Sequence, residues 1–136
     1  MREELAPRLS PGVMLVGRRD DVRDWLIAGD VVVQPSRWEG LSLVTLEAMA
    51  CGRSIVATDV DGMREVLGQA DNDSVGTIVP VKDRVALVDA LTIRLMDRDL
   101  AAREGEHARE RAERFDLARW GDRLAAVTLD TAARVG

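Results

Sequence analysis

Two glutamates, Glu39 and Glu47, flank a mostly apolar run in the segment WEGLSLVTLEAMACG, residues 38–52. The predicted helix neighbours of Glu47 are apolar, so an ionised carboxylate there is costly unless a partner donates hydrogen bonds to it. A vicinal diol such as a ribose would donate two such bonds. Glu47 is therefore a candidate ligand for a pair of sugar hydroxyls, although an arginine partner or a wet edge of the helix would explain it equally well.

The segment from Pro35 to Ser42 has features of an anion-binding site. Pro35 ends a predicted strand, and Ser42 can cap the helix predicted over residues 42–50. The free N–H groups and the positive dipole end of that helix would attract an anion. Gly40 has no side chain, so a ligand can approach its backbone closely. In an open α/β sheet such loops lie at the carboxyl ends of the strands, where ligands bind.

The elements that must position these residues follow from the apolar pattern. Short β-branched runs alternate with helical patterns and carry near-continuous apolar residues, as parallel strands covered on both faces do. The pattern predicts strands at residues 13–16, 31–34, 54–57 and 77–79, and helices at residues 21–28, 42–50 and 62–67. This alternation is typical of a doubly wound, Rossmann-like parallel α/β sheet.

The remainder of the chain is expected to be helical. We expect a helix at residues 83–97, a charged and largely solvated helix at 98–114, and a last helix capped by Asp116. That last helix carries Leu117, Trp120, Leu124 and Val127. Residues 68–76, GQADNDSVG, are expected to form a surface loop. No linker divides the chain, so residues 1–136 are expected to form one partial domain, with sheet and helices at 13–97 and a helical tail at 98–136.

Composition narrows the class of protein. The chain has 136 residues, of which 46% are hydrophobic and 32% charged, as in one globular domain. A net charge of −5 argues against a nucleic-acid partner. No apolar run approaches the ~18 residues of a transmembrane segment, and no signal peptide is visible. The single Cys51 excludes an internal disulfide and fits a reducing compartment, so a cytoplasmic location is expected.

Residues 35–66, PSRWEGLSLVTLEAMACGRSIVATDVDGMREV, resemble the donor-binding segment of retaining GT-B glycosyltransferases, above all the large family four. That family carries two glutamates separated by seven residues. The similarity extends through VMLVGRRDDVRDWLIAGDVVVQPS, GTIVPVKDRVALVDAL and RFDLARW, and so covers about residues 13–127. An E-x7-E spacing alone is common, but Pro-Ser before it and EAMACG at its end make the match specific. The resemblance implies the C-terminal part of a GT-B fold and transfer of a sugar, with retention, from a nucleotide-sugar such as a UDP- or GDP-sugar, with no cofactor and no metal.

The resemblance also implies roles for individual residues. Glu39 corresponds to the glutamate that contacts the hydroxyls of the donor sugar, and Glu47 to the glutamate that holds the ribose hydroxyls. Gly40 and Leu41 correspond to backbone amides that face the sugar and the diphosphate. None of these residues is an acid–base catalyst, so the catalytic residues stay unknown.

Four further positions take their interpretation from the same resemblance. The helix start at Ser42 and Leu43 would face the diphosphate. Arg18 and Arg19 correspond to a loop that often contacts the base, although two exposed arginines without a role explain them as well. Asp61, a fifth position, stands where a glycine is usual in the family.

Two parts of the family's fold have no counterpart in this sequence. They are the first two strands of the donor domain, which carry the basic residues that clamp the diphosphate, and the N-terminal acceptor-binding domain. In a sheet of order 3-2-1-4-5-6 this leaves a gap between the strands at residues 13–16 and 31–34. We expect either that the first of these slides in beside the second or that self-association or a partner chain completes the sheet. The chain alone is expected not to transfer sugar.

Other candidate sites are weaker. Asp59 and Asp61 form a D-x-D triplet, a metal–nucleotide signature of another glycosyltransferase fold, but three residues are a weak match and no metal site is expected. His107 lies among charges and is expected to be a solvated surface residue. Cys51 is expected to be a small core residue, because no histidine is paired with it.

Two other functions stay open at this stage. One is a non-catalytic α/β remnant or interaction module that no longer binds nucleotide. The other is a different GT-B enzyme, such as a nucleotide-sugar epimerase, whose histidine- and arginine-rich site residues are not apparent here. The sequence identifies neither the acceptor nor the particular nucleotide and sugar.

Overall fold

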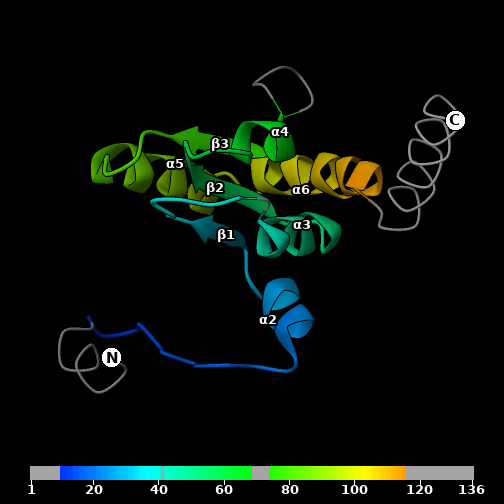
Figure 1. The fold of residues 1–136 in the computed structure, drawn as a ribbon. Coiled ribbons are helices and arrows are strands. Elements are labelled where there is room, and N and C mark those ends of the chain that lie inside the picture. The colour runs from blue at the N-terminus through cyan, green and yellow to red at the C-terminus, as the bar shows by residue number, and fades with distance from the viewer. Residues whose placement is uncertain (1–9, 41, 69–73, 116–136) are drawn as a thin grey trace, which may run out of the picture.

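The computed structural model describes residues 10–40, 42–68 and 74–115. Three parallel strands form its sheet, in the order β1-β2-β3 (Figure 1). They are β1 (Val31–Gln34), β2 (Ser54–Thr58) and β3 (Gly76–Val79). In the register of the sheet, Val32 lies opposite Ile55 and Val56 lies opposite Thr77.

Helices cover both faces of this sheet, as the α/β pattern predicts. α5 (Arg84–Met96) packs on the face that carries Val56 and Val79, through Ala90. α3 (Leu43–Ala50), α4 (Met63–Leu67) and α6 (Arg98–Ala112) pack on the other face, with Ile55 and Ala57 of β2. Because β2 is central and covered on both sides, all five of its residues are buried. α2 (Val22–Ala28) precedes β1, and the 3-10 turn η2 (Glu113–Phe115) follows α6.

Local signals explain where three helices begin. The Ser42 hydroxyl accepts a hydrogen bond from the Thr45 amide at the start of α3, which confirms the predicted cap. Asp83 caps α5 and Asp97 caps α6 in the same way. Such caps satisfy N–H groups that have no partner inside the helix.

The predicted strand at residues 13–16 is wrong. The structure describes these residues as irregular, and Figure 1 shows the segment that precedes α2 lying apart from the sheet. A β-branched run becomes a strand only where another strand pairs with it. The segment did not slide in beside β1, which therefore forms one edge of the described sheet.

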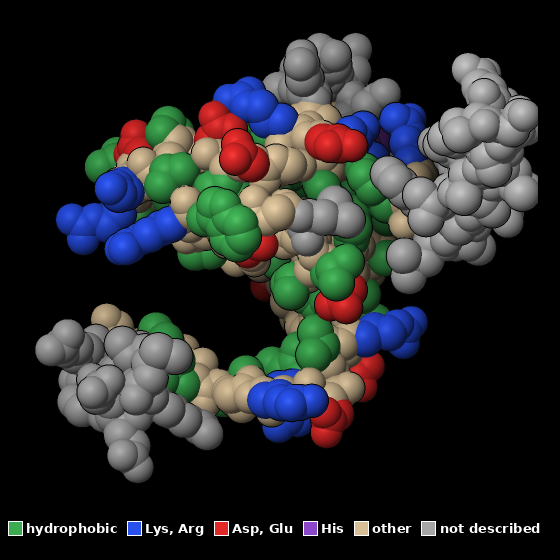
Figure 2. Space-filling model, viewed as in Figure 1, with side chains coloured by type: hydrophobic (Ala, Val, Ile, Leu, Met, Phe, Trp, Pro, Cys, Tyr) green, Lys and Arg blue, Asp and Glu red, His purple; other side chains and the backbone are tan. Residues whose placement is uncertain are grey.

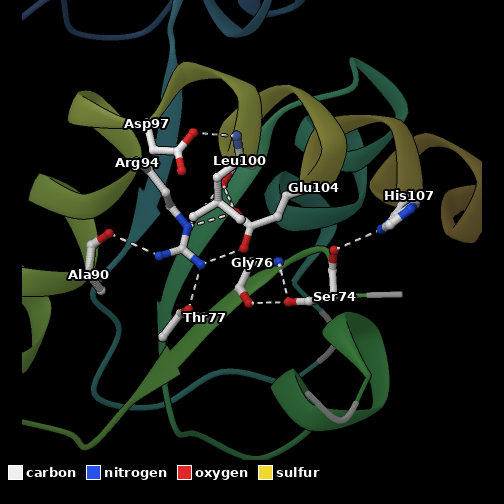
Figure 3. A network of polar contacts seen from close by, with 10 residues as sticks. Ser74, Gly76, Thr77, Ala90, Arg94, Asp97, Leu100, Glu104 and His107 are labelled. Carbon is white, nitrogen blue, oxygen red and sulfur yellow. Dashed lines mark hydrogen bonds and ion pairs between the residues drawn. The ribbon is translucent and has the colours of Figure 1, made fainter. Parts of the chain in front are cut away.

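The charged stretch after residue 97 is also more buried than predicted. α6 packs against α3 and β2 through Gly105 and Ala108, which are buried, and it buries the charged Glu104. Glu104 is tolerated because Arg94 of α5 binds both of its carboxylate oxygens, at 2.7 and 2.6 Å (Figure 3). High charge content in the sequence conceals this narrow buried strip of the helix.

Two further expectations fall in this region. The expectation that His107 is solvated is wrong, because the half-buried ring places Nδ1 3.3 Å from the carbonyl oxygen of Ser74 (Figure 3). The predicted helix after Asp116 lies outside the described residues, as does most of the loop predicted at 68–76. Within the described part of the chain, every helix is too short or too polar to cross a lipid bilayer.

Candidate functional site

The connection from β1 to α3 holds Glu39 in place. The side chain is half-buried, and its Oε1 accepts hydrogen bonds from Gln34 Nε2 and Ser36 Oγ, both at 2.9 Å. The loop is fixed in turn by Thr58 at the end of β2, whose hydroxyl donates to the carbonyl oxygen of Ser36. Oε2 of Glu39 receives no hydrogen bond from the described residues, so this oxygen can accept one from a ligand.

Open space lies in front of Gly40. A Cβ built on this exposed residue would meet no atom within 4 Å. Behind it, the loop after β2 approaches closely: Gly62 has φ 79°, and a Cβ there would lie 2.8 Å from the Gly40 carbonyl oxygen. Two loops at the carboxyl edge are therefore packed backbone to backbone, with the Gly40 side accessible.

The start of α3 lies beside this open space. Ser42 is buried and caps the helix, while Leu43 is 64% exposed. The N–H groups of the first turn that the cap does not use can bind an anion in solvent. Leu41 lies outside the described residues.

Glu47 is exposed, so the expectation that its apolar neighbours make an ionised carboxylate costly there is wrong. The helix buries Thr45, Ala48 and Met49. Its outer face presents Leu43, Val44, Glu47 and Ala50. Leu43 and Val44 are apolar but exposed, so apolar neighbours in the sequence do not indicate that Glu47 is buried. Glu47 makes no hydrogen bond or ion pair with the described residues. It lies on the solvent-exposed edge of the helix and has no arginine partner among those residues.

Glu39 and Glu47 thus belong to one connection, the loop after β1 and the helix it feeds. Their placement at the carboxyl end of a parallel sheet agrees with the region in which such folds bind ligands. That Glu39, Gly40, Leu41 and Glu47 line a single pocket stays a prediction. Trp38, on the same loop, is 79% exposed and anchors nothing among the described residues.

Arg18 and Arg19 lie elsewhere, on the segment that precedes α2 (Figure 1). Arg19 binds both carboxylate oxygens of Asp21 at 2.7 Å, and its guanidinium lies 5.3 Å from the centre of the Trp25 ring. The hydrogen bonds between Arg19 and Asp21 lower the pKa of the Asp21 carboxyl and raise the pKa of Arg19. The structure describes no contact between these arginines and the β1–α3 connection.

One of the two carboxylates of the D-x-D triplet is bound by an arginine of the same chain. Arg64 donates to both oxygens of Asp59, at 2.8 and 2.5 Å, and these hydrogen bonds lower the pKa of that carboxyl. Asp61 is exposed. In the part of the chain that the structure describes, no three His, Cys, Asp or Glu side chains are grouped as metal ligands would be.

Sequence reasoning missed Gln34 and Ser36, the two residues that hold Glu39. The sequence pattern places Gln34 at a strand end and gives it no role in a site. Its signal was its polarity: an amide closes an otherwise apolar strand, five residues before the glutamate that it binds.

Comparison with known proteins identifies the family of the chain. Residues 1–97 match the family model of the glycosyl transferases group 1. The chain is 35% identical over 120 residues to the lipopolysaccharide core biosynthesis mannosyltransferase LpsB of Rhizobium meliloti, a match that covers 88% of the chain and 34% of that protein. It is 39% identical over 116 residues to a D-inositol 3-phosphate glycosyltransferase of Xylanimonas cellulosilytica, covering 85% of the chain and 26% of that protein.

A solved structure gives the same result. Sucrose-phosphate synthase from Thermosynechococcus elongatus superposes on 98% of the chain with a TM-score of 0.86 and 29% identity, and the match covers 34% of that enzyme. The chain thus spans about a third or less of the length of these proteins. The predicted α/β fold and the resemblance to GT-B glycosyltransferases are confirmed. By its family model and its relatives, the chain belongs to the glycosyl transferases group 1 family.

Proposed function

We propose that this chain forms the nucleotide-sugar-binding part of a glycosyltransferase that transfers a sugar to an acceptor with retention. One observation carries the proposal: at the carboxyl edge of a parallel sheet, the carboxylate of Glu39 is held beside an accessible glycine and a capped helix start, and one of its oxygens receives no hydrogen bond from the described residues. Carboxylates recognise hydroxyl pairs, and helix starts recognise phosphate oxygens.

The proposed roles divide the donor between four positions. Glu39 accepts hydrogen bonds from hydroxyls of the sugar, and the backbone at Gly40 and Leu41 faces the sugar and the diphosphate. The start of α3 offsets charge on the leaving diphosphate, and Glu47 accepts from the ribose hydroxyls. These groups position the donor and stabilise developing charge; none of them transfers a proton.

The proposal includes no metal or other cofactor, and the donor is a UDP- or GDP-sugar. The engagement of Asp59 by Arg64 supports a donor site without a metal–carboxylate bridge. The free Cys51 is consistent with a reducing compartment such as the cytoplasm.

The test is the binding of a free nucleoside diphosphate and then of the sugar nucleotide, measured by calorimetry. Glu47→Gln should weaken binding of the diphosphate by about tenfold, on the order of 1–2 kcal/mol, because a neutral amide replaces a charged acceptor of the ribose hydroxyls. Glu39→Gln should change the affinity for the diphosphate less, because its partner, the sugar, is absent from that ligand.

The matched control is Glu110→Gln, an exposed glutamate on α6 that makes no hydrogen bond or ion pair among the described residues. It should leave both affinities unchanged. If the diphosphate binds and Glu47→Gln does not alter its affinity, the ribose assignment is lost.

A second expectation concerns activity. Because the match covers about a third or less of its relatives, we expect the purified chain, with no other protein added, to produce no glycosylated acceptor from a UDP- or GDP-sugar. Radiolabelled donor and a mixture of candidate acceptors would reveal any product. A single labelled product formed by the chain alone would refute this expectation.

The second candidate function is an interaction module that no longer binds nucleotide. The described edge of the sheet at β1 favours it, because an edge strand is a surface on which another chain can pair. Thermal unfolding with and without nucleoside diphosphate separates the two functions. A rise in melting temperature with ligand supports nucleotide binding, and no change at saturating concentrations supports the module.

A further inference from the structure

A hollow of about 300 Å³ opens at the carboxyl edge of the sheet, next to the proposed donor site but not part of it. Three pieces of chain enclose it: the loop after β1, the end of β2 and the turn that leads from β3 into α5. It is lined by Pro35, Ser36, Arg37, Thr58, Val81, Lys82, Asp83, Arg84 and Leu87. Glu39, Gly40 and Glu47 do not line it.

Three basic residues, Arg37, Lys82 and Arg84, are among those that line this hollow. All three are exposed, and none makes a hydrogen bond or ion pair with another described residue. In this they differ from Arg64 and Arg94, whose guanidinium groups are bound by carboxylates. Figure 2 shows basic side chains gathered at the end of the molecule where α5 begins. The hollow is therefore lined by three positive charges and the one negative charge of Asp83, and none of the three basic groups is paired with a carboxylate among the described residues.

The other polar groups of the hollow are already engaged. The carboxylate of Asp83 accepts a hydrogen bond from the Ala86 amide at 2.9 Å, so it caps α5 and does not bind the basic side chains. The Thr58 hydroxyl donates to the carbonyl oxygens of Ser36 and Gln34. The donors left for a ligand are the three basic side chains, together with the amides of Arg84 and Val85 in the first turn of a 13-residue helix, which Asp83 does not use.

The backbone holds Lys82 at the rim. Its φ is 67°, the only positive φ of a residue other than glycine in the described part of the chain. A hydrogen bond of 3.2 Å from the Asp83 amide to the Pro80 carbonyl oxygen closes the turn around it. A left-handed conformation is unfavourable for lysine, and this residue directly precedes Asp83, the N-cap of α5.

We propose that this hollow binds the phosphate group of a small phosphomonoester. A guanidinium matches two phosphate oxygens at once, and a phosphomonoester offers three oxygens and close to two negative charges to two arginines and a lysine. A carboxylate, with two oxygens and one charge, leaves part of this set unused. The volume exceeds that of a phosphate alone and lies at the lower end of small-molecule sites, which leaves room for a monosaccharide or polyol. A nucleic acid is disfavoured by the net charge of −5.

The experiment uses the whole chain and inorganic phosphate as the probe, with chloride added to keep ionic strength constant. Amide chemical shifts of residues 82–87 are followed by NMR during the titration. We expect saturable shifts there, and an affinity about tenfold weaker in the double variant Arg37→Gln/Arg84→Gln. Both side chains are exposed, so the variant should keep its fold, which the remaining amide spectrum verifies.

The control double variant, Arg23→Gln/Arg103→Gln, removes the same charge from exposed positions on α2 and α6. It should bind phosphate within about twofold of the original chain, because distant exposed charges are screened. Acetate at equal concentration should shift these amides less. The proposal is overturned if phosphate causes no saturable shift at residues 82–87, if both double variants lose affinity equally, or if acetate binds as tightly as phosphate.

Discussion

At the scale of single residues, three glutamates differ in how much of their hydrogen-bonding capacity the protein uses. Glu104 is buried, and both of its oxygens are bound, by Arg94 and by the Ser54 hydroxyl. Glu39 is half-buried, and among the described residues neutral donors reach only one of its oxygens. Glu47 has no described partner. A half-buried carboxylate that keeps an acceptor free among the described residues has the pattern of a binding residue, and Glu39 has this pattern. Glu47 is exposed and without a described partner, as Glu110 is, so its assignment to the ribose stays a prediction.

Glu104→Gln tests the structural role. The change keeps the shape of the side chain but leaves the guanidinium of Arg94, of which 5% of the side chain is exposed, without its counter-charge. Removing one partner of a buried ion pair costs about 3–5 kcal/mol. We expect urea unfolding to show a loss of this size in the free energy of unfolding, or a chain that no longer folds.

Glu106→Gln is the control for this substitution, since it makes the same chemical change on the solvent side of α6. Its effect should stay within about 0.5 kcal/mol. Equal effects of the two substitutions would mean that the Arg94–Glu104 pair does not stabilise the fold.

At the scale of elements, local patterns predicted most of the structure. The strand at 31–34 and the helix starts at Ser42 and Asp83 follow from β-branched runs and caps, whose causes lie within a few residues. The strand predicted at residues 13–16 is wrong because strand formation depends on a neighbouring strand, which the local sequence does not encode. The prediction that α6 is largely solvated is wrong for a similar reason. The buried strip of this helix depends on Arg94 and Gly52, which lie outside it in the chain. Gln34 was missed because its partner is identified only by the course of the loop.

Gly105 lies where the backbone of α6 closely approaches the backbone of another part of the domain. A Cβ on this residue would lie 2.2 Å from the carbonyl oxygen of Gly52 in the turn after α3, an obstacle made of backbone. We expect Gly105→Ala to destabilise the chain by about 1–3 kcal/mol in urea unfolding, because α6 must move away from α3 and β2.

Helix propensity alone would give the opposite sign for this substitution, since alanine is favoured over glycine inside a helix by about 1 kcal/mol. Ala102→Gly, at an exposed position of the same helix, measures that propensity without a packing change and should cost about 1 kcal/mol. A gain in stability from Gly105→Ala would show that the contact of α6 with Gly52 is loose in solution.

At the scale of the whole molecule, the helices before and after β1 in the chain, α2 and α3, expose several large apolar side chains. No residue of α2 is buried, and Trp25 and Ile27 on that helix are 43% and 42% exposed. Leu43 and Val44, on the outer face of α3, are 64% and 46% exposed. Sucrose-phosphate synthase, an enzyme about three times as long, nevertheless superposes on 98% of the chain with a TM-score of 0.86. The exposed apolar side chains therefore belong to a conformation that a larger molecule also adopts, and they lie next to a sheet edge that can pair.

This geometry predicts self-association of the purified chain through β1. With no other protein present, a second copy is the available partner for the β1 edge and for the apolar side chains beside it. Light scattering should give a mass above that of one chain, rising with protein concentration. Hydrogen exchange at the amides of Val31–Gln34 should slow over the same concentrations. Exchange in β2, which is paired on both sides, serves as the internal reference and should stay constant. A monomer at all concentrations, with β1 amides that exchange rapidly throughout, would mean that the edge is stable without a partner.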